Sequence, residues 1–227
     1  MLSGEGLARL ATRALDFVRD GAVVGLGSGR AAGAFLRALA AQVRQGRAVR
    51  GVPTSEATAA LARELGVPLI TLGAAAIDLI VDGADEVDPA LNLIKGYGGA
   101  LVRERIVAAA AARQLILVGS EKLVPVLGSR GRLPLEVVPF ALPLVLERLG
   151  RLGLTAAARR AEGRPLLSDN GNALVDCAVG PIADPAALER ELRAIPGVVD
   201  TGLFLGTAGT VLVADGDAVR ELGRQRP

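Results

Sequence analysis

The chain of 227 residues contains no histidine and a single cysteine, Cys177. Histidine is the commonest proton carrier in enzymes, so a general base here must be a carboxylate, a lysine or a less usual group. A zinc site is disfavoured because zinc is held mainly by Cys and His side chains. One cysteine cannot form an internal disulfide, and we expect Cys177 to be a small buried strand residue.

Lysine is nearly absent, since Lys95 and Lys122 are the two lysines among 26 basic residues. Codon bias or heat adaptation would explain a preference for arginine, and the two lysines could then remain by accident. Arginine, however, cannot replace a compact ammonium that stabilises charge at one point. We therefore expect both lysines at functional positions.

Aromatic residues make up 2 % of the chain and the net charge is +2, so a nucleic-acid surface is not expected. No apolar run approaches the roughly 20 residues that span a bilayer, so a membrane partner is not expected either. Residues 1–20 show helical periodicity and carry acids, which argues against a signal peptide. These features predict a cytoplasmic protein.

Apolar strand-like runs alternate with helical patterns in the first half of the chain. Such alternation implies right-handed β-α-β crossovers and an α/β fold with a doubly wound, mainly parallel sheet. The expected strands are 21–27, 48–53, 67–71, 77–81 and 114–119, and the expected helices are 31–43, 55–65 and a segment from Ala100.

The pattern changes after Gly128, where β-α-β-β-α-β order predicts a ferredoxin-like α+β module. Its strands are expected at 135–140, 154–161, 172–179 and 198–204, and its helices at 141–153 and 185–195. A further strand at 209–216 would return to the first domain. We therefore predict a catalytic domain of 1–127 plus 205–227 and an inserted small domain of 128–204.

Residues 82–104 combine acids, a lysine and glycines between a predicted strand and a predicted helix. In an open α/β sheet, ligands bind at this edge. Paired carboxylates beside a lysine suit proton transfer, because like charge raises one pKa while the ammonium holds the anion. A metal could use the same acids, but Lys95 and the glycine amides would compete with it. The groups are Asp82, Asp85, Glu86, Asp88, Lys95, Gly96, Gly98, Gly99 and Glu104.

Two of these acids have plain alternatives. Glu104 is flanked by Arg103 and Arg105, so it could belong to a solvated charged face. Asp88 precedes Pro89 in an expected turn and needs no chemical role.

The segment GLGSGRAAG at 25–33 places glycines between a strand and a helix, where backbone amides can meet an anion. It lacks the glycine spacing and the acidic residue of a dinucleotide site, since position 49 is Val, and it lacks the lysine of a P-loop. One phosphate held by Ser28, Gly29 and Arg30 fits better. The alternative is a tight strand–helix turn.

Four further features are less specific. Ser55 in PTSEAT can be explained as a helix cap, with a sugar or phosphate contact as the other possibility. Lys122 follows a strand and could reach a phosphate. Glu136 lies within an apolar strand, where an edge or interface carboxylate is the simpler interpretation. The segment SDNGN at 168–172 is typical of a hairpin turn.

Several motifs in order, GLGSG, GVPTSEAT, DGADEVDPALNLIKGYGGALVRE, LPLEVVPFA, DNGN and IPGVVDTGLF, resemble the A-type ribose-5-phosphate isomerase family from about residue 21 to 204. The resemblance implies a Rossmann-like large domain, a smaller α+β domain, no metal or cofactor, and a homodimer or homotetramer. It implies interconversion of ribose 5-phosphate and ribulose 5-phosphate in the pentose phosphate pathway.

By position, the resemblance places the general base on Glu104, the sugar-contacting acids on Asp82 and Asp85, and the oxyanion-stabilising lysine on Lys95. It extends the substrate contacts to the phosphate loop, the loop after Asp82, the glycine loop and one further lysine. These residues are Ser28, Gly29, Arg30, Ala31, Gly83, Ala84, Gly96, Tyr97, Gly98 and Lys122.

Three departures from the family pattern stand out. The phosphate loop, commonly TGST, is SGRA here, so Arg30 either binds the phosphate or points away. Tyr97 replaces a usual glycine and would be strained at a positive φ. The usual lysine near the N-terminus is missing, with Leu7 in its neighbourhood. The competing hypothesis is a sugar-phosphate-binding sensor module, which would need the phosphate loop but not the acid–lysine–acid set.

Overall fold

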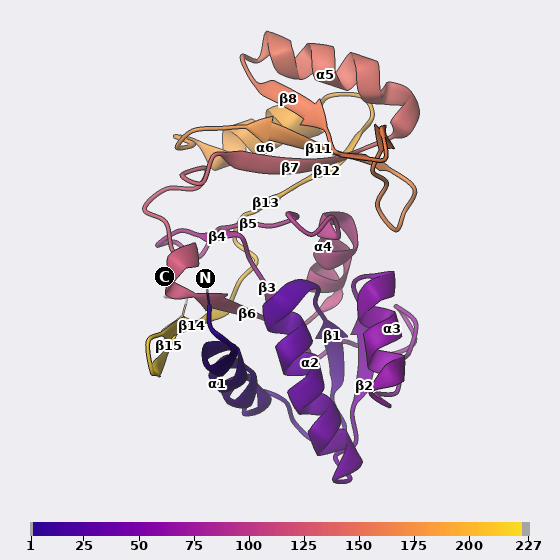
Figure 1. Ribbon diagram of the computed structural model, residues 1–227, viewed down its shortest axis with the longest axis vertical. Coiled ribbons are helices and arrows are strands. Elements are labelled where there is room, and N and C mark those ends of the chain that lie inside the picture. The colour runs from indigo at the N-terminus through magenta and orange to yellow at the C-terminus, as the bar shows by residue number, and fades with distance from the viewer. Residues whose placement is uncertain (1, 224–227) are drawn as a thin grey trace. The chain divides into compact units, whose positions relative to one another are not determined.

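The computed structural model describes residues 2–223, which form two compact units (Figure 1). The first unit comprises the residues up to Ala84, Arg103–Leu123 and the residues from Thr207 onward. The second comprises Asp85–Val102 and Val124–Gly206. The second unit thus includes 85–102 besides the whole segment 128–204, and the independent small domain of 128–204 stays a prediction.

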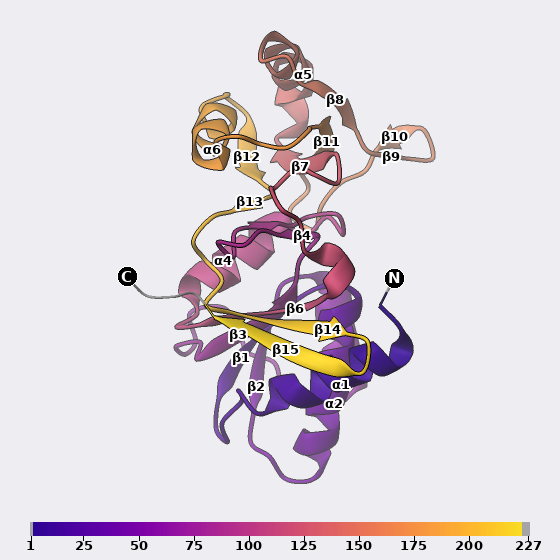
Figure 2. The same ribbon diagram turned by 90° about the vertical axis from the view of Figure 1, so that its left-hand side faces the viewer.

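A six-stranded sheet forms the centre of the first unit, in the order β15-β14-β6-β3-β1-β2. All neighbours are parallel except β14 and β15, which lie side by side as an antiparallel pair (Figure 2). The predicted doubly wound, mainly parallel sheet is therefore confirmed. The strands are β1 (Val23–Leu26), β2 (Arg50–Pro53), β3 (Leu79–Gly83), β6 (Gln114–Gly119), β14 (Thr210–Asp215) and β15 (Ala218–Gly223).

The sheet differs from the sequence prediction at two places. The expected strand at 67–71 is wrong, because that segment makes only an isolated bridge between Leu69 and Gly51. Strand β15 was not predicted, since its alternating polar residues lie at the exposed end of the sheet.

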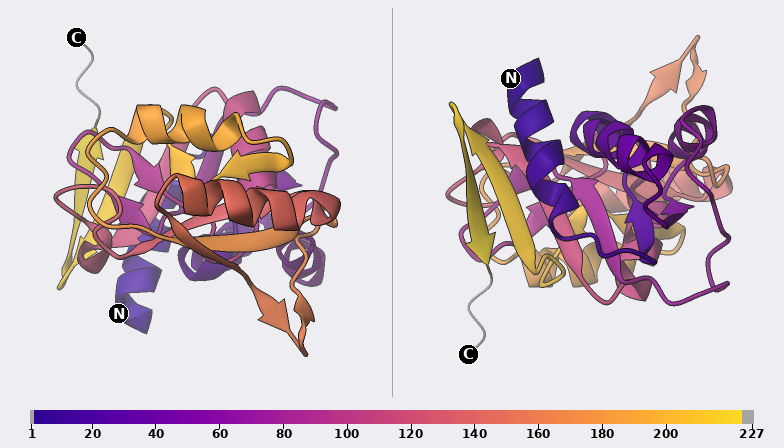
Figure 3. Two further views of the ribbon diagram at one scale, coloured as in Figure 1. Left: turned by 90° about the horizontal axis from the view of Figure 1, so that it is seen from above. Right: turned by 90° about the horizontal axis from the view of Figure 1, so that it is seen from below.

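Helices cover both faces of the parallel sheet, because side chains alternate along each strand. Val24 and Leu26 of β1 join the core beneath α1 (Gly4–Leu15) and α2 (Gly29–Arg44). Val23 joins the opposite core, which includes Val107 of α4 (Leu101–Ala110). The view from below shows α1 and α2 along one face of the sheet (Figure 3). Helix α3 (Glu56–Glu64) follows β2.

Strand order defines the edge at which a ligand is expected. The chain passes from β1 to β2 on one side and then returns to β3 on the other side of β1. Ligands of open α/β sheets bind beyond the carboxyl ends of the strands at such a switch point. The residues there are Gly27 and Ser28 after β1, and Asp82 at the end of β3.

The second unit contains a four-stranded antiparallel sheet in the order β12-β7-β11-β8. Leu133, Leu135 and Val137 of β7 pack with Val145 of α5 and Leu192 of α6. The two helices lie side by side over this sheet (Figure 3). The predicted β-α-β-β-α-β order is found in β7 (Arg132–Val137), α5 (Leu142–Arg151), β8 (Thr155–Ala158), β11 (Ala173–Ala178), α6 (Pro185–Arg193) and β12 (Val198–Thr201).

The predicted last strand of this unit is divided at Gly202. Strand β12 ends at Thr201, and β13 (Leu203–Phe204) pairs instead with β5 (Leu93–Ile94), which also pairs with β4 (Glu86–Val87). The Gly202 N–H donates to the Pro134 carbonyl at 2.7 Å. A Cβ at Gly202 would lie 2.4 Å from the Lys95 carbonyl oxygen, so glycine is required where the chain changes sheets.

The predicted strand 154–161 is likewise divided, into β8 and β9 (Arg160–Ala161), and β9 pairs with β10 (Arg164–Pro165). Two 3₁₀ turns, η1 (Ser120–Lys122) and η2 (Pro139–Ala141), complete the elements. Within residues 2–223 no helix is both long and apolar enough to cross a membrane.

Candidate active site

Asp82 joins the loops that follow β1 and β3 in the first unit. Its side chain is fully buried, and Oδ1 accepts hydrogen bonds from the N–H of Ser28 at 3.1 Å and of Gly83 at 2.8 Å. A Cβ at Gly27 would lie 2.2 Å from that same oxygen. Only glycine therefore allows the loop after β1 to approach this carboxylate.

The helix that follows this loop lacks the serine cap found on its neighbours. Ser3 caps α1 and Ser55 caps α3, each through a side-chain oxygen that accepts a backbone N–H. Ser28 precedes α2 in the same position, but its hydroxyl makes no cap. It lies 2.9 Å from the hydroxyls of both Thr54 and Ser55. Ser28 Oγ therefore does not cap the first-turn amides of α2, which lie at the positive end of the helix.

Buried hydroxyls of the β2–α3 loop and of the first turn of α3 hold the loop after β1 in place. Thr54 donates to the Leu26 carbonyl at 3.0 Å, and Thr58 donates to the Gly27 carbonyl at 3.0 Å. The capping role expected of Ser55 is confirmed, because its Oγ accepts the Thr58 N–H at 3.1 Å. In this structure the polar PTSEAT segment supports the loop that carries Ser28.

The remaining predicted residues of the first unit lie along the same carboxyl edge of the sheet. Arg30 is exposed on the first turn of α2, and its Nη2 donates to the Leu2 carbonyl at 3.3 Å. Ala31 follows it in that turn, and Gly83 and Ala84 follow Asp82. Lys122 is half-buried at the end of η1, immediately after β6.

Glu104 lies on the buried face of α4, and its side chain is 6 % exposed. Val107, one turn further along, is buried on the same side. Neighbouring Arg103 donates to Glu56 at 2.8 Å, and this hydrogen bond lowers the pKa of Glu56. The alternative that Glu104 belongs to a solvated charged face is wrong, because the helix turns it inward.

Lys95, in the second unit, is 2 % exposed at the end of β5. Its N–H donates to the Gly202 carbonyl at 2.9 Å. Its Nζ lies 5.6 Å from the centre of the Phe204 ring, within the range of a cation–π contact. One of the two lysines of the chain is therefore buried.

The glycine loop after Lys95 is shaped by two residues with positive φ, Gly96 (103°) and Gly99 (86°). Tyr97 is not among the residues with positive φ, so the strain considered for it is not found. The Tyr97 N–H donates to Asp85 Oδ2 at 2.9 Å. The Tyr97 ring lies against the Arg132 guanidinium at 3.8 Å, and burial raises the pKa of its hydroxyl. The loop therefore binds a carboxylate through a backbone amide.

Two acids of the same motif have structural partners. Glu86 is fully buried, and its two oxygens accept the N–H groups of Gly128 at 2.6 Å and Arg130 at 2.8 Å. Asp88 accepts the N–H of Asn92 at 2.8 Å within its turn, as expected for a residue without a chemical role. Asp82 and Asp85 remain the candidate acids of this segment.

Glu136 is not the edge or interface carboxylate that the sequence suggested. It is fully buried on β7, an inner strand. Its Oε1 accepts hydrogen bonds from Ser168 Oγ (2.9 Å), Asn170 Nδ2 (3.0 Å) and Asn172 Nδ2 (2.8 Å). The predicted turn at 168–172 is confirmed by the Ser168 N–H to Asn172 carbonyl bond at 2.8 Å. Glu136 thus anchors this turn.

The predicted site residues are distributed over both units. The contacts bring Ser28, Asp82 and Gly83 together in the first unit, and Asp85 and Tyr97 together in the second. Gly202 was missed, although a glycine inside an apolar strand pattern is a signal of close backbone approach. The first unit also contains Gly29, Arg30, Ala31, Ala84, Glu104 and Lys122, and the second contains Lys95, Gly96 and Gly98.

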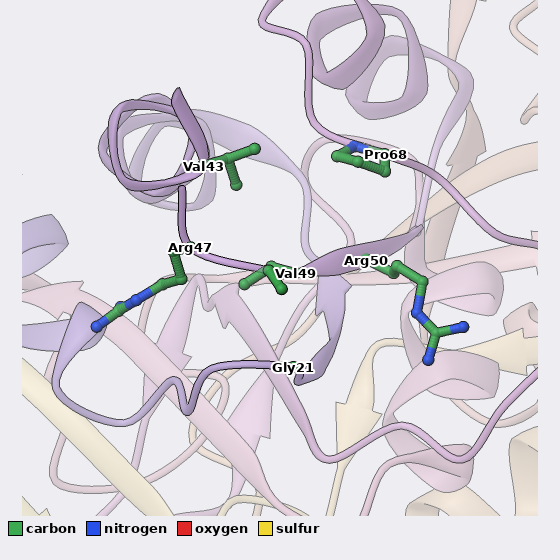
Figure 4. Close-up of a pocket in the computed structure, with 7 residues that line it drawn as sticks. Gly21, Val43, Arg47, Val49, Arg50 and Pro68 are labelled. Atoms are coloured by element: carbon green, nitrogen blue, oxygen red, sulfur yellow. The ribbon is translucent and has the colours of Figure 1, made fainter. Parts of the chain in front are cut away.

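A pocket of about 450 Å³ lies at the opposite edge of the parallel sheet, beside the start of β2 (Figure 4). Gly21, Val43, Val49 and Pro68 are among the residues that line it, together with two arginines. Figure 4 shows these arginines, Arg47 and Arg50, extending in opposite directions, so they do not converge on one anion. None of the predicted site residues lines this pocket.

Within residues 2–223, no group of three or more acidic, histidine or cysteine side chains is arranged to hold a metal ion. A parallel sheet with an uncapped helix N-terminus at its carboxyl edge is typical of α/β enzymes that act on a small anionic substrate.

Comparison with known proteins identifies the family. The sequence model of Ribose 5-phosphate isomerase A (phosphoriboisomerase A) matches residues 50–218. Ribose-5-phosphate isomerase A of Roseiflexus castenholzii is 52 % identical over 94 % of this chain and 93 % of its own length. That of Gloeobacter violaceus is 49 % identical over 93 % of each chain. The chain belongs to the ribose 5-phosphate isomerase A family.

Solved structures agree with this assignment. A D-ribose-5-phosphate isomerase in complex with phospho-erythronic acid superposes with a TM-score of 0.95 at 38 % identity, covering 99 % of this chain and 100 % of that one. Ribose 5-phosphate isomerase A of Methanocaldococcus jannaschii gives 0.92 at 38 % identity, covering 96 % and 98 %.

Proposed function

We propose that this chain interconverts ribose 5-phosphate and ribulose 5-phosphate through an enediolate, the isomerase step of the pentose phosphate pathway. One observation supports the proposal most strongly: Asp82, Lys95 and Glu104 are all almost fully buried. Burying charged groups is costly, so such a set is typical of a reacting centre. A sensor module would need only the phosphate loop.

The phosphate group of the substrate would meet the first-turn amides of α2, because Ser28 leaves them uncapped. Arg30, on that turn, would add a charge-assisted contact in place of the hydroxyl usual in the family. Lys122 follows the neighbouring strand β6 and would contribute a second cation. The contacts in this part of the site are Ser28, Gly29, Arg30, Ala31 and Lys122.

The sugar would meet the acids and the glycine loop. Asp82 and Asp85 would act on hydroxyls, including the ring oxygen during opening. Glu104 would remove the proton from carbon 2 of the aldose and return it to carbon 1 of the ketose. Lys95 would stabilise the negative charge that develops on the sugar oxygen. The remaining contacts are Gly83, Ala84, Gly96, Tyr97 and Gly98.

The reaction as proposed needs no metal and no cofactor. Proton transfer between adjacent carbons changes no overall oxidation state, and Lys95 supplies positive charge where the oxyanion forms. The chain offers no histidine for a metal ion.

A coupled assay with purified protein, ribose 5-phosphate and excess chelator tests both the isomerase activity and its independence of metal. We expect full turnover in chelator. Loss of activity that a divalent cation restores would refute metal independence, and loss of activity under all conditions would refute the isomerase proposal.

We also propose that the protein is a cytoplasmic homodimer or homotetramer. Phe140 is 96 % exposed, and Val138 and Leu144 beside it in the second unit are also exposed. Neighbouring exposed apolar residues favour a protein interface. Light scattering of the wild type and of Phe140→Asp tests this, because a monomeric wild type or an unchanged mass in the variant contradicts an interface at this place.

A further inference from the structure

Arg159 connects the antiparallel sheet of the second unit to the glycine loop. It lies between β8 and β9, and its side chain is 12 % exposed. Its Nε and Nη2 donate to the two carboxylate oxygens of Asp176 at 2.9 and 2.7 Å. Its Nη1 donates to the Tyr97 carbonyl and its Nη2 to the Gly96 carbonyl, both at 3.0 Å.

This arrangement uses properties that only arginine has. A guanidinium presents five N–H donors in one rigid plane, so it can bind a carboxylate with one edge and two carbonyls with the other. A lysine ammonium at the same place would reach only part of this set. Asp176 fixes the orientation of the plane, and it also lies 3.5 Å from Arg132, whose guanidinium contacts the Tyr97 ring.

The two carbonyl contacts determine where the next two amides point. The described peptide bonds include no cis bond, and in a trans peptide the C=O of one residue and the N–H of the next point in opposite directions. With both carbonyls turned toward Arg159, the N–H groups of Tyr97 and Gly98 are turned away from it. The Tyr97 N–H accordingly donates to Asp85 Oδ2 at 2.9 Å.

By the same geometry the Gly98 N–H, like that of Tyr97, points away from Arg159. Among the hydrogen bonds between residues 2–223, it has no acceptor. An N–H that is held in a fixed direction and left without an acceptor in the protein is suited to a developing oxyanion. The loop's own backbone cannot fix this direction, because Gly96 and Gly99 both take positive φ and glycine is the most flexible residue.

We propose that Arg159 is a positioning residue for the reaction: it holds the Gly96 and Tyr97 carbonyls so that the Gly98 N–H and the adjacent Lys95 stay directed at the sugar. This role rests on the proposed function of the glycine loop. Asp176 supports it by orienting the guanidinium. Arg159 itself acts through the loop and does not touch the substrate.

Steady-state kinetics of Arg159→Lys, with Arg160→Gln as the matched control, test the proposal. Arg160 is the next residue, is exposed, and donates only to the Gly163 carbonyl of its own hairpin at 2.8 Å among its described contacts. For Arg159→Lys we expect kcat to fall by about 10- to 100-fold with a smaller change in KM, because a misdirected group costs about that much in rate. Arg160→Gln should keep the wild-type values.

Chemical rescue separates positioning from mere stabilisation. Methylguanidinium added to Arg159→Ala should restore part of kcat, whereas methylammonium should not, and neither should change Arg160→Ala. If Arg159→Ala does not fold, Arg159→Lys and Asp176→Asn are used instead. Both variants should lower kcat while the melting temperature changes little. Wild-type kcat in Arg159→Lys, or a lowered melting temperature with unchanged kcat, overturns the positioning role but leaves the proposed function standing. A wild-type enzyme without turnover overturns both.

Discussion

The two units each contain a glycine-rich loop that meets a carboxylate through backbone amides, but the two loops are held differently. The loop at 27–31 connects the end of β1 directly to the start of α2, and the hydroxyls of Thr54 and Thr58 bind the carbonyls of Leu26 and Gly27 at its beginning. The loop at 95–99 follows the two-residue strand β5. Its Gly96 and Tyr97 carbonyls are bound by Arg159, more than sixty residues away in the chain.

This difference suggests that the first loop binds the phosphate and the second stabilises the charge that develops during the reaction. A helix N-terminus offers a broad positive end that suits a phosphate, whose contacts are similar in the ground state and the transition state. A single buried ammonium beside one fixed amide suits charge that exists only during the reaction. We therefore expect changes in the first loop to appear mainly in KM and changes in the second mainly in kcat.

The largest effect is expected for Glu104→Gln. Gln keeps the size and hydrogen bonding of the side chain but removes the base, so kcat should fall by about 100-fold or more with KM nearly unchanged. Exchange of the transferred hydrogen with solvent should be lost together with turnover. Glu64→Gln, an exposed acid of α3, is the control. Turnover near the wild-type rate would move the base to Asp82 or Asp85.

The second-largest fall in kcat is expected for Lys95→Arg and Lys95→Met. Removal of a preorganised donor to an oxyanion lowers kcat by about 100- to 1,000-fold. Arg should not rescue, because its planar fork cannot take the buried place of an ammonium beside Phe204. Kinetics of both variants at saturating substrate measure this. A Lys95→Arg enzyme with near-native kcat would show that charge alone suffices and would remove the contrast between the loops.

Arg30→Ala tests the first loop. If Arg30 binds the phosphate, KM should rise by about 10- to 100-fold with kcat little changed, since a charge-assisted hydrogen bond contributes about 1.5–3 kcal/mol. Arg37→Ala, an exposed arginine on the same helix, should leave KM unchanged. If KM is unchanged in Arg30→Ala as well, the guanidinium does not bind the phosphate, and its contact with the Leu2 carbonyl is structural.

The smallest effect concerns Cys177 in the core of the second unit. Burial, and to a lesser degree Asp176, raises the pKa of its thiol from 9.0 to about 12. The folded state thus favours the neutral thiol, and this contribution to stability is complete below pH 9 and is lost as the pH rises toward 12. Cys177→Ala should therefore flatten the decline of the melting temperature over this range. Native protein should also resist thiol reagents at pH 8, and rapid labelling would contradict the burial.

Much of the fold and of the candidate site could be read from residue patterns. The alternation of apolar runs predicts the parallel sheet, and the order of elements after Gly128 predicts the second sheet with its two helices. The turn at 168–172 and the cap at Ser55 follow from local side-chain chemistry. The acid–lysine–glycine segment stands out because its residue types are rare together.

The sequence predictions are wrong where residues that are distant in the chain but close in space determine the local structure. Residues 67–71 are apolar enough for a strand, but they find only the bridge from Leu69 to Gly51. Glu136 seemed suited to an edge, yet three donors from the 168–172 turn satisfy one of its oxygens inside the sheet. The flanking arginines suggested that Glu104 could belong to a solvated charged face. Glu104 is buried, however, and Arg103 forms an ion pair with Glu56.

Most of the elements, the two kinds of sheet and the chemically active residue types follow from the sequence alone, because these depend on side-chain periodicity and on interactions within a few positions. Three features become visible once the chain is folded: which hydroxyl caps a helix and which is turned away, where Gly202 lets the chain change sheets, and how Arg159 orients the peptides after Lys95. Those outcomes depend on hydrogen bonds between distant residues. One arginine among 24 looks like any other until the fold places two carbonyls and a carboxylate around it.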